Sequence, residues 1–167
     1  MSELQDDAFA QLERSHRRLE ERLIELEEAA DAIEAGRDVA QALETVRGVA
    51  AWFGRAGARH EADEEASLFP RLRAHGVAAA LCEELAAQHR AQADLWAEMA
   101  RLLAASELDA AALAARVRAL FRSYAAHVRA EEDELFPAAR AALDAAELAG
   151  MLEEMAARRG RGGGQGA

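Results

Sequence analysis

HEADEEASLFP at residues 60–70 and HVRAEEDELFP at residues 127–137 share one pattern, and that pattern decides the fold. Each segment reads histidine, three residues, glutamate, and then Leu-Phe-Pro at the same distance from the histidine. Residues four apart on an α-helix are separated by about 40° around the axis and roughly 6 Å along it. The histidine and the glutamate of each segment can therefore point at one place. The repeat predicts two helices that carry matching polar side chains.

A larger unit repeats outward from these segments. His16 and His89 each precede one segment, on a stripe in which apolar residues and the histidine recur at steps of three and four. That spacing is typical of one face of a bundle helix. The chain therefore reads as an internal duplication, about residues 5–75 and 78–142. The duplicated polar residues on the core stripes are His16, His60, Glu64, His89, His127 and Glu131.

Composition predicts an all-α protein, because Ala, Leu, Glu and Arg dominate and only 2 prolines occur. Four long apolar stripes joined by short connections predict an up-down-up-down antiparallel four-helix bundle. A short additional C-terminal helix is predicted over residues 144–159. The Gly-rich tail at 160–167 (GRGGGQGA) is predicted to be disordered. We expect residues 1–159 to form one bundle domain.

Several residues predict where the helices begin, end or bend. Gly36 is expected to end the first helix, and Asp38 to cap the second. Either Ser106 or Asp109 is expected to cap the fourth. Pro70 is expected to kink or end the second helix near its far end.

Charge and cysteine usage narrow the expected partners and compartment. The formal net charge is −11 and the sequence pI is about 4.9. Such a surface repels the phosphates of nucleic acids and anionic membranes, so we expect neither as a partner. The single cysteine, Cys82, excludes an internal disulfide and fits a reducing cytoplasm. With no long apolar run and no signal-peptide pattern at the start, we expect a cytoplasmic protein.

The duplicated residues predict a metal site. Burying a carboxylate without a partner costs several kcal/mol, and divalent cations would remove that cost. Mixed imidazole and carboxylate ligation suits iron or manganese and tolerates zinc. One inward histidine alone is more often an ordinary core residue, and one His-x3-Glu pair is often an exposed contact. Four core histidines in a twofold repeat with matching glutamates favour two metal ions instead. His75 has no counterpart in the other half, and we leave it out of the site.

These residues and the two segments resemble the hemerythrin-like HHE cation-binding domain, over about residues 5–142. The resemblance implies a non-heme di-iron centre with an oxo or hydroxo bridge. It implies that Glu64 and Glu131 bridge the metals and that the four histidines are terminal ligands.

Two positions bear on which members of this family the chain resembles. Oxygen-carrying hemerythrins have a further histidine four residues after the third-helix ligand, where this chain has Ala93. In some HHE domains that sense iron, an acid directly follows the second-helix histidine. Glu61 occupies that position and is a candidate extra ligand, the alternative being a solvated surface glutamate. Its counterpart in the other half is Val128.

Tyr124 is a candidate for a supporting role in catalysis. It lies one turn before His127 on the same face, and the matching position in the first half is Gly57. Its phenol could donate a hydrogen bond to a metal-bound oxygen species or to a ligand carboxylate. Alternatively it only fills the bundle.

The leading functional hypothesis is therefore a cytoplasmic non-heme di-iron protein. It would bind or reduce a small oxidant, namely dioxygen, peroxide or nitric oxide. A different hypothesis is an iron-dependent sensor or binding module whose folding depends on the metal. A third is metal storage without turnover.

Overall fold

The structure, a computed structural model, describes the backbone of residues 3–162 and the side chains of residues 8–160. Within that range every regular element is helical and no strand occurs, which confirms the predicted all-α class. Four segments span the molecule, and a shorter helix, α8 (Ala145–Gly162), follows them. In chain order the segments are α1 (Glu3–Glu34); α2 (Val39–Trp52), η1 (Phe53–Gly57), α3 (Ala58–Asp63), η2 (Glu64–Leu68) and α4 (Phe69–Ala74); α5 (Ala79–Ala104); and α6 (Ala110–Ala130), η3 (Glu131–Leu135) and α7 (Phe136–Ala142).

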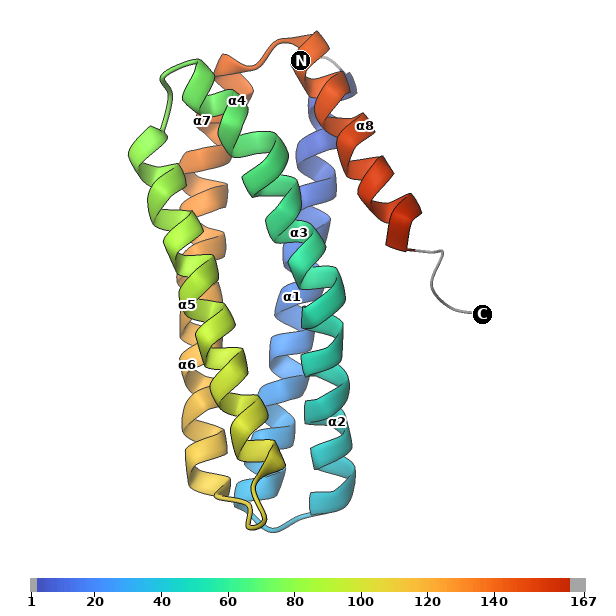
Figure 1. Ribbon diagram of the computed structural model, residues 1–167, viewed down its shortest axis with the longest axis vertical. Helices are drawn as coiled ribbons and strands as arrows, with labels where there is room; N and C mark the ends of the chain where they lie inside the picture. The colour runs from blue at the N-terminus through green and yellow to red at the C-terminus, as the bar shows by residue number, and fades with distance from the viewer. Residues whose placement is uncertain (1–2, 163–167) are drawn as a thin grey trace.

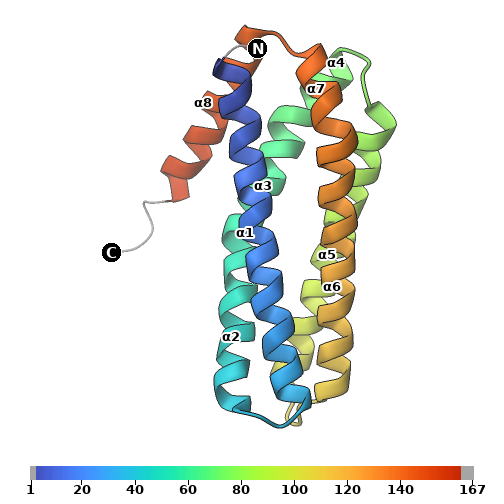
Figure 2. The same ribbon diagram turned by 180° about the vertical axis from the view of Figure 1, so that it is seen from behind.

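The segments lie side by side, and each runs opposite to the one before it (Figure 1). The helix α1 packs against both α2 and α6, and α5 packs against α6. The backbones of α2 and α5 approach each other less closely than those three pairs do. Figure 2 shows α8 outside the four segments, running back from the end where α1 begins; its contacts are with α1, α3 and η2.

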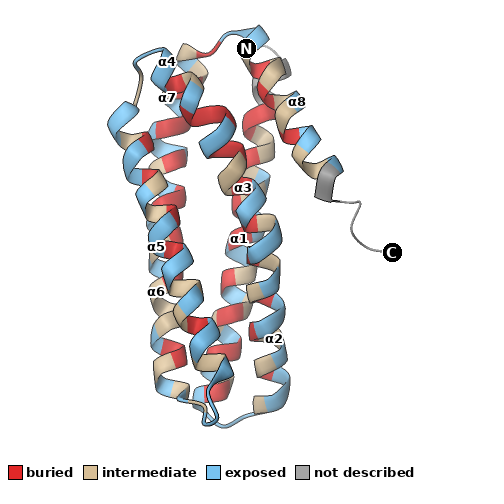
Figure 3. Ribbon diagram, in the orientation of Figure 1, coloured by how far each residue is buried: buried red, intermediate tan, exposed pale blue. Residues whose placement is uncertain are grey.

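The core is divided into two apolar clusters with a polar layer between them. Leu19, Val46 and Val117 belong to the cluster near the α1–α2 connection. Leu12 and Leu148 belong to the cluster at the other end, which α8 completes. Figure 3 shows buried residues along both halves of the segments. The site described below lies between these clusters, with apolar packing on both sides of the polar layer.

Three π-helical turns interrupt the α-helical geometry, and two of them match the sequence repeat. The turns η2 and η3 begin at the two glutamates of the repeat and end directly before Phe-Pro. Proline has no N–H to donate, and its ring clashes with the carbonyl four residues earlier. A wider turn before Pro70 and Pro137 relieves that clash. The helix therefore continues beyond Pro70 as α4 instead of ending there.

The helix ends follow the predictions in part. Gly36 adopts a left-handed backbone with φ 67° just after α1, as expected of a terminating glycine. Asp38 also has a left-handed backbone, with φ 42°, and makes no side-chain cap, so the prediction that it caps α2 is wrong. Asp109 caps α6 by accepting from the Ala112 N–H at 2.9 Å. Because Asp109 makes this bond, it is the cap, and Ser106 is not.

The last helix is longer than expected. It begins with a reciprocal cap in which the Asp144 side chain accepts from the Glu147 N–H at 2.9 Å and Glu147 accepts from the Asp144 N–H at 3.1 Å. It extends to Gly162, past the predicted end at residue 159. The rest of the tail predicted to be disordered, residues 163–167, lies outside the described residues. Across the described helices, none is both long enough and apolar enough to cross a membrane.

Candidate metal centre

The six predicted residues meet in one layer across the four segments. They form two groups, and within each group the candidate ligand atoms all lie within 4.8 Å of one another. Both groups contain the same two glutamates, and each adds two histidines of its own. The first group is His16, His60, Glu64 and Glu131, and the second is Glu64, His89, His127 and Glu131.

Glu64 offers one carboxylate oxygen to each group. Its Oε1 lies 3.0 Å from Nε2 of His60, which is four residues earlier on the same helix. Its Oε2 lies 3.3 Å from Nε2 of His89, on α5. The His-x3-Glu spacing produces the first contact, and the packing of α5 against the second segment produces the other.

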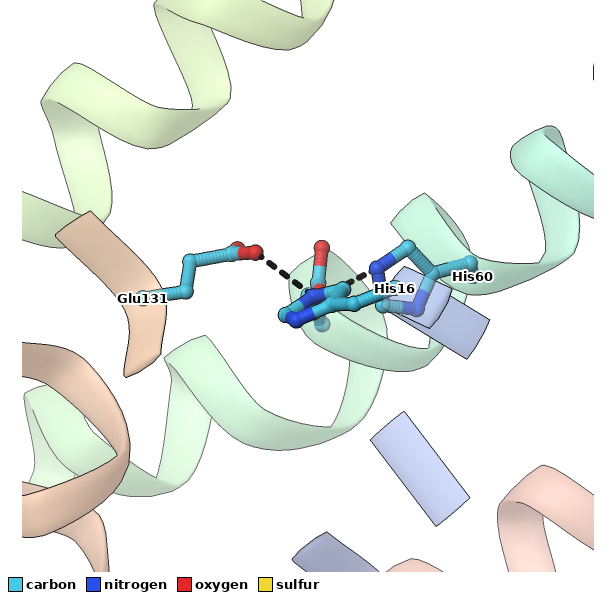
Figure 4. A group of neighbouring side chains, drawn as sticks. His16, His60 and Glu131 are labelled. Atoms are coloured by element: carbon cyan, nitrogen blue, oxygen red, sulfur yellow. Dashed lines mark ion pairs between the residues drawn. The ribbon is translucent and has the colours of Figure 1, made fainter. Parts of the chain in front are cut away.

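Glu131 is arranged in the same way from the other half of the chain. Its Oε1 lies 3.2 Å from Nε2 of His127, and its Oε2 lies 3.0 Å from Nε2 of His16. Figure 4 shows the carboxylate of Glu131 and the ring of His60 on either side of the His16 ring. Two carboxylates that each face both groups have the disposition of bridging ligands.

The outer nitrogens of two rings are held by acids from the opposite half. Nδ1 of His16 lies 2.7 Å from Oε1 of Glu132, and Nδ1 of His89 lies 2.7 Å from Oε1 of Glu65. A ring that donates its Nδ1 hydrogen to a carboxylate keeps the Nε2 lone pair free for a metal. Each half thus supplies an acid that orients a histidine of the other half.

The remaining two rings differ from each other. Nδ1 of His127 lies 2.9 Å from the side-chain oxygen of Gln88. The residue matching Gln88 in the first half is Ser15, whose hydroxyl donates instead to the Gln11 carbonyl at 3.1 Å. Neither ring nitrogen of His60 has a hydrogen-bond partner among the described residues. The ring of His60 is therefore the least constrained of the four.

Orphaned polar atoms show that the donor set fits a cation. All four carboxylate oxygens of Glu64 and Glu131 are buried and lack hydrogen bonds among the described residues. The close approaches to the imidazoles lack hydrogen-bond geometry for Glu64, Glu131 and His16. Nε2 of His89 faces Nε2 of His127 at 3.0 Å, so at most one of them can carry a hydrogen between them. Lone pairs turned toward a common centre are costly to bury unless a metal accepts them.

The imidazoles and carboxylates of the site shift one another's pKa values. Burial alone would lower the pKa of His16, but contacts with Glu131 and Glu64 outweigh it and raise this pKa to about 10. The pKa of His89 is raised to about 9 because Glu64 and Glu65 likewise outweigh burial. Burial would raise the pKa of Glu64, yet the surrounding imidazoles hold it well below its usual range. The glutamate is thus kept ionised, as a metal ligand must be.

Two phenylalanines close the layer on one side. Phe136 stacks on His16 with ring centroids 5.4 Å apart, and Phe69 stacks on His89 with centroids 6.3 Å apart. Both phenylalanines come from the Leu-Phe-Pro part of the repeat and both are fully buried. They fix the planes of the rings and exclude water from that side.

Glu61 lies near the six residues but outside the two groups. Its side chain is half-buried and lines a narrow space beside His60, His89 and Tyr124. Burial raises the pKa of Glu61, and the charge of His89 opposes that rise. Its role as an extra metal ligand therefore stays a prediction.

Tyr124 is buried beside the site, and its hydroxyl accepts a hydrogen bond from Trp96 Nε1 at 3.1 Å. Burial raises the pKa of the phenol, so it stays protonated. Its own O–H has no acceptor among the described residues and remains available to a ligand. By contrast, His75 lies outside both groups, with Nε2 2.8 Å from Oε1 of Glu147 on α8.

Sequence reasoning missed four polar residues around the layer. The acids Glu65 and Glu132 had a signal, because both segments carry two consecutive glutamates at the same position. Gln88 had no such signal, since its counterpart is a serine. Gln92 lies three residues after His89, a spacing shared by any core position of that helix, and its amide is fully buried with neither atom hydrogen-bonded among the described residues.

Of the comparisons with known proteins, the one with protein-family models agrees with this geometry. A search of curated proteins found no significant match. The family model described as "Hemerythrin HHE cation binding domain" matches residues 7–139, which contain all six residues and both repeated segments. The chain therefore belongs to the hemerythrin HHE cation-binding domain family.

Proposed function

We propose that this chain is a non-heme di-iron protein that binds or reduces a small oxidant, namely dioxygen, peroxide or nitric oxide. The observation that carries the proposal is the pair of ligand groups that share both carboxylates. Glu64 and Glu131 would bridge two irons within an up-down-up-down bundle. The four histidines would be terminal ligands, and an oxo or hydroxo group would complete the bridge. The same imidazole and carboxylate donors could also hold manganese or zinc.

The protein groups around the site support this chemistry. An iron pair supplies up to two electrons when both ions are ferrous. Each group offers four protein donor atoms, and non-heme iron sites with few protein ligands keep positions open for small molecules. Phe69 and Phe136 keep water from one side of the layer. Tyr124 offers an O–H donor at the other side, toward the cluster that contains Leu19.

Metal analysis of the full chain tests the proposal. We expect two irons per chain after anaerobic loading, and a change in the optical spectrum when an oxidant is added. Because each carries ligand atoms, His60→Ala and Glu131→Ala should lower metal content. His75→Ala, the control, should not. A protein that binds no iron, or whose spectrum no oxidant changes, would contradict the proposal.

One observation favours a second candidate, an iron-dependent sensor that reports through α8. Asp63, which directly precedes Glu64, is fully buried and pairs with Arg158 at 2.8 Å and Arg159 at 2.9 Å, both on α8. Glu154 of α8 also accepts from Ser67, a residue of η2. The helix α8 is thus tied to the turn that positions a metal ligand.

Proteolysis with and without metal separates the two candidates. A sensor should show α8 released and cut when metal is removed, with no turnover of oxidant. Asp63→Asn should mimic that release, because the neutral amide no longer forms the ion pairs of the buried Asp63 carboxylate with the partly exposed Arg158 and Arg159 side chains. Asp31→Asn is the matched control, since Asp31 forms only an exposed pair with Arg118. Full protection of α8 in metal-free protein would rule the sensor out. Bound metal without turnover or release would indicate storage.

The remaining expectations are part of the proposal. The net charge of −11 supports a small-molecule partner over nucleic acid or a membrane surface. The one cysteine, Cys82, is a free buried thiol and supports a cytoplasmic location. A reductant that restores the ferrous state would be a further partner.

A further inference from the structure

A pocket opens between the second segment and α5, on the side where the two backbones approach least closely. Its volume is about 320 Å³. Phe53, Trp96 and Tyr124 form its floor, and small residues such as Gly54 and Ala93 line its exposed walls. Ala93 is the position at which oxygen-carrying hemerythrins have their further histidine.

The aromatic floor explains why the pocket is not closed by packing. The Phe53 ring lies 4.6 Å from the Trp96 ring and 5.1 Å from the Tyr124 ring, measured between centroids. These rings hold the segments apart, while the small residues above them do not reach across. Such a concave apolar surface with a few polar groups at its inner end is the usual form of a small-molecule site.

The inner end of the pocket leads to the metal layer. Glu61 and Tyr124 line the pocket and also line a narrow space of about 10 Å³ beside His89 and His127. A space of that size holds about one water-sized group, not a whole organic molecule. Gln92 borders the same space, fully buried, with both amide atoms unpartnered among the described residues.

The chemistry of the lining selects the class of ligand. None of the residues that line the pocket is basic, and Glu61 would repel an anion, so the lining disfavours an anionic ligand. The aromatic floor favours an apolar body larger than a diatomic molecule. At the inner end, Gln92 can donate and accept a hydrogen bond, and the O–H of Tyr124 can donate one. The polar end of the ligand is therefore small and has both a hydrogen-bond donor and an acceptor.

We propose that this pocket admits an organic hydroperoxide, R–O–O–H, with R on the aromatic floor and the O–O–H end between Tyr124 and Gln92. This inference rests on the proposed function and names its substrate class. The reaction breaks the O–O bond, takes up two electrons and two protons, and yields the alcohol R–OH and water. The two ferrous ions of the proposed centre would each supply one electron and become ferric, and solvent at the open mouth of the pocket would supply the protons.

A second pocket provides the internal control. It lies between α1 and α6, has a volume of about 240 Å³ and also reaches Tyr124. Its other lining residues include Leu23, Ile24 and Ala125. Like the first pocket it shares two residues with the narrow space, here Leu19 and Tyr124, but Glu61 is not among its lining residues. Because the proposed entry is on the Glu61 side, filling this second pocket should leave hydroperoxide entry unchanged.

Binding is tested on the zinc-loaded full chain, where no redox reaction occurs. Trp52→Phe makes Trp96 the only tryptophan, and its fluorescence is titrated with 2-phenyl-2-propanol, the alcohol product of cumene hydroperoxide. We expect saturable binding that Ala93→Leu weakens at least tenfold, and that Ala125→Leu does not change. Ala100→Leu, which lies seven residues further along the same wall, repeats the test if Ala93→Leu folds poorly by circular dichroism.

Reaction kinetics of the iron-loaded chain complete the test. Ala93→Leu should slow oxidation of the ferrous centre by cumene hydroperoxide about tenfold and change the rate with hydrogen peroxide less than twofold. Unsaturable titration, or an equal effect of Ala125→Leu, would overturn the inference. Reaction with hydrogen peroxide alone would overturn it while leaving the proposed function intact. Reaction with no oxidant at all would overturn both.

Discussion

At the scale of single residues, the hydrogen bond from His127 to Gln88 has no counterpart on His60. Ordered partners on the outer nitrogen of a ligand histidine typically change metal affinity 10–100-fold. We expect Gln88→Ala to weaken metal binding by about that factor, measured by competition with a chelator. Ser15→Ala is the matched control, because among the described residues the Ser15 hydroxyl hydrogen-bonds the Gln11 carbonyl and no imidazole. Equal affinities for the wild type and Gln88→Ala would show that Gln88 does not orient the ring.

Gln92 supports a prediction in which stability and function change in opposite directions. An amide buried without partners costs roughly 1–3 kcal/mol, so Gln92→Leu should raise the Tm of the protein. The same change removes the donor and acceptor at the inner end of the α5 pocket and should weaken binding of 2-phenyl-2-propanol. A residue with only a packing role would move the Tm without moving the binding.

At the scale of elements, the two π-helical turns set where the residues that follow each glutamate lie. A regular helix of the same length would rotate the residues after Glu64 away from the layer. Pro70→Ala restores an N–H and removes the clash that widens η2. We expect helix content by circular dichroism to be unchanged and metal affinity to fall, because Phe69 and the neighbouring Glu65 shift relative to His89. An unchanged affinity would mean that the turn does not depend on proline.

Much of this arrangement follows from the sequence, because its cause is local. The step of four residues between histidine and glutamate places both on one helix face whatever the rest of the chain does. The internal repeat then predicts that a second copy lies opposite. Local spacing and composition are therefore enough to predict the six residues and the all-α class.

Other features depended on how the helices pack, and the sequence did not predict them. Glu65 and Glu132 are partly exposed acids, and only the rotation of neighbouring helices brings them to His89 and His16. Asp38 is a good capping residue by type, but the connection before α2 needs a left-handed backbone there. The pocket beside Ala93 likewise depends on the separation of two helices, which three aromatic rings set.

At the scale of the whole molecule, the site contributes to folding stability in a way that depends on pH. In the metal-free protein the carboxylates raise the pKa of His16 to about 10 and that of His89 to about 9, against 6.5 for the unbound side chains. A pKa raised on folding stabilises the protein fully below the unfolded value, and this gain is lost as the pH rises through the folded value.

The Tm of the metal-free protein should therefore fall as the pH rises from about 7 to about 10. Metal-bound imidazoles are neutral over this whole range, so the loaded protein should not show that loss. Thermal melts of both forms across this range measure the difference, and His75→Ala, outside the site, should leave the difference between the two forms unchanged. If the two forms followed the same curve, the imidazolium–carboxylate contacts would not be what holds the metal-free layer together. The size of the fall in Tm thus measures how much the imidazolium–carboxylate contacts stabilise the protein when no metal is bound.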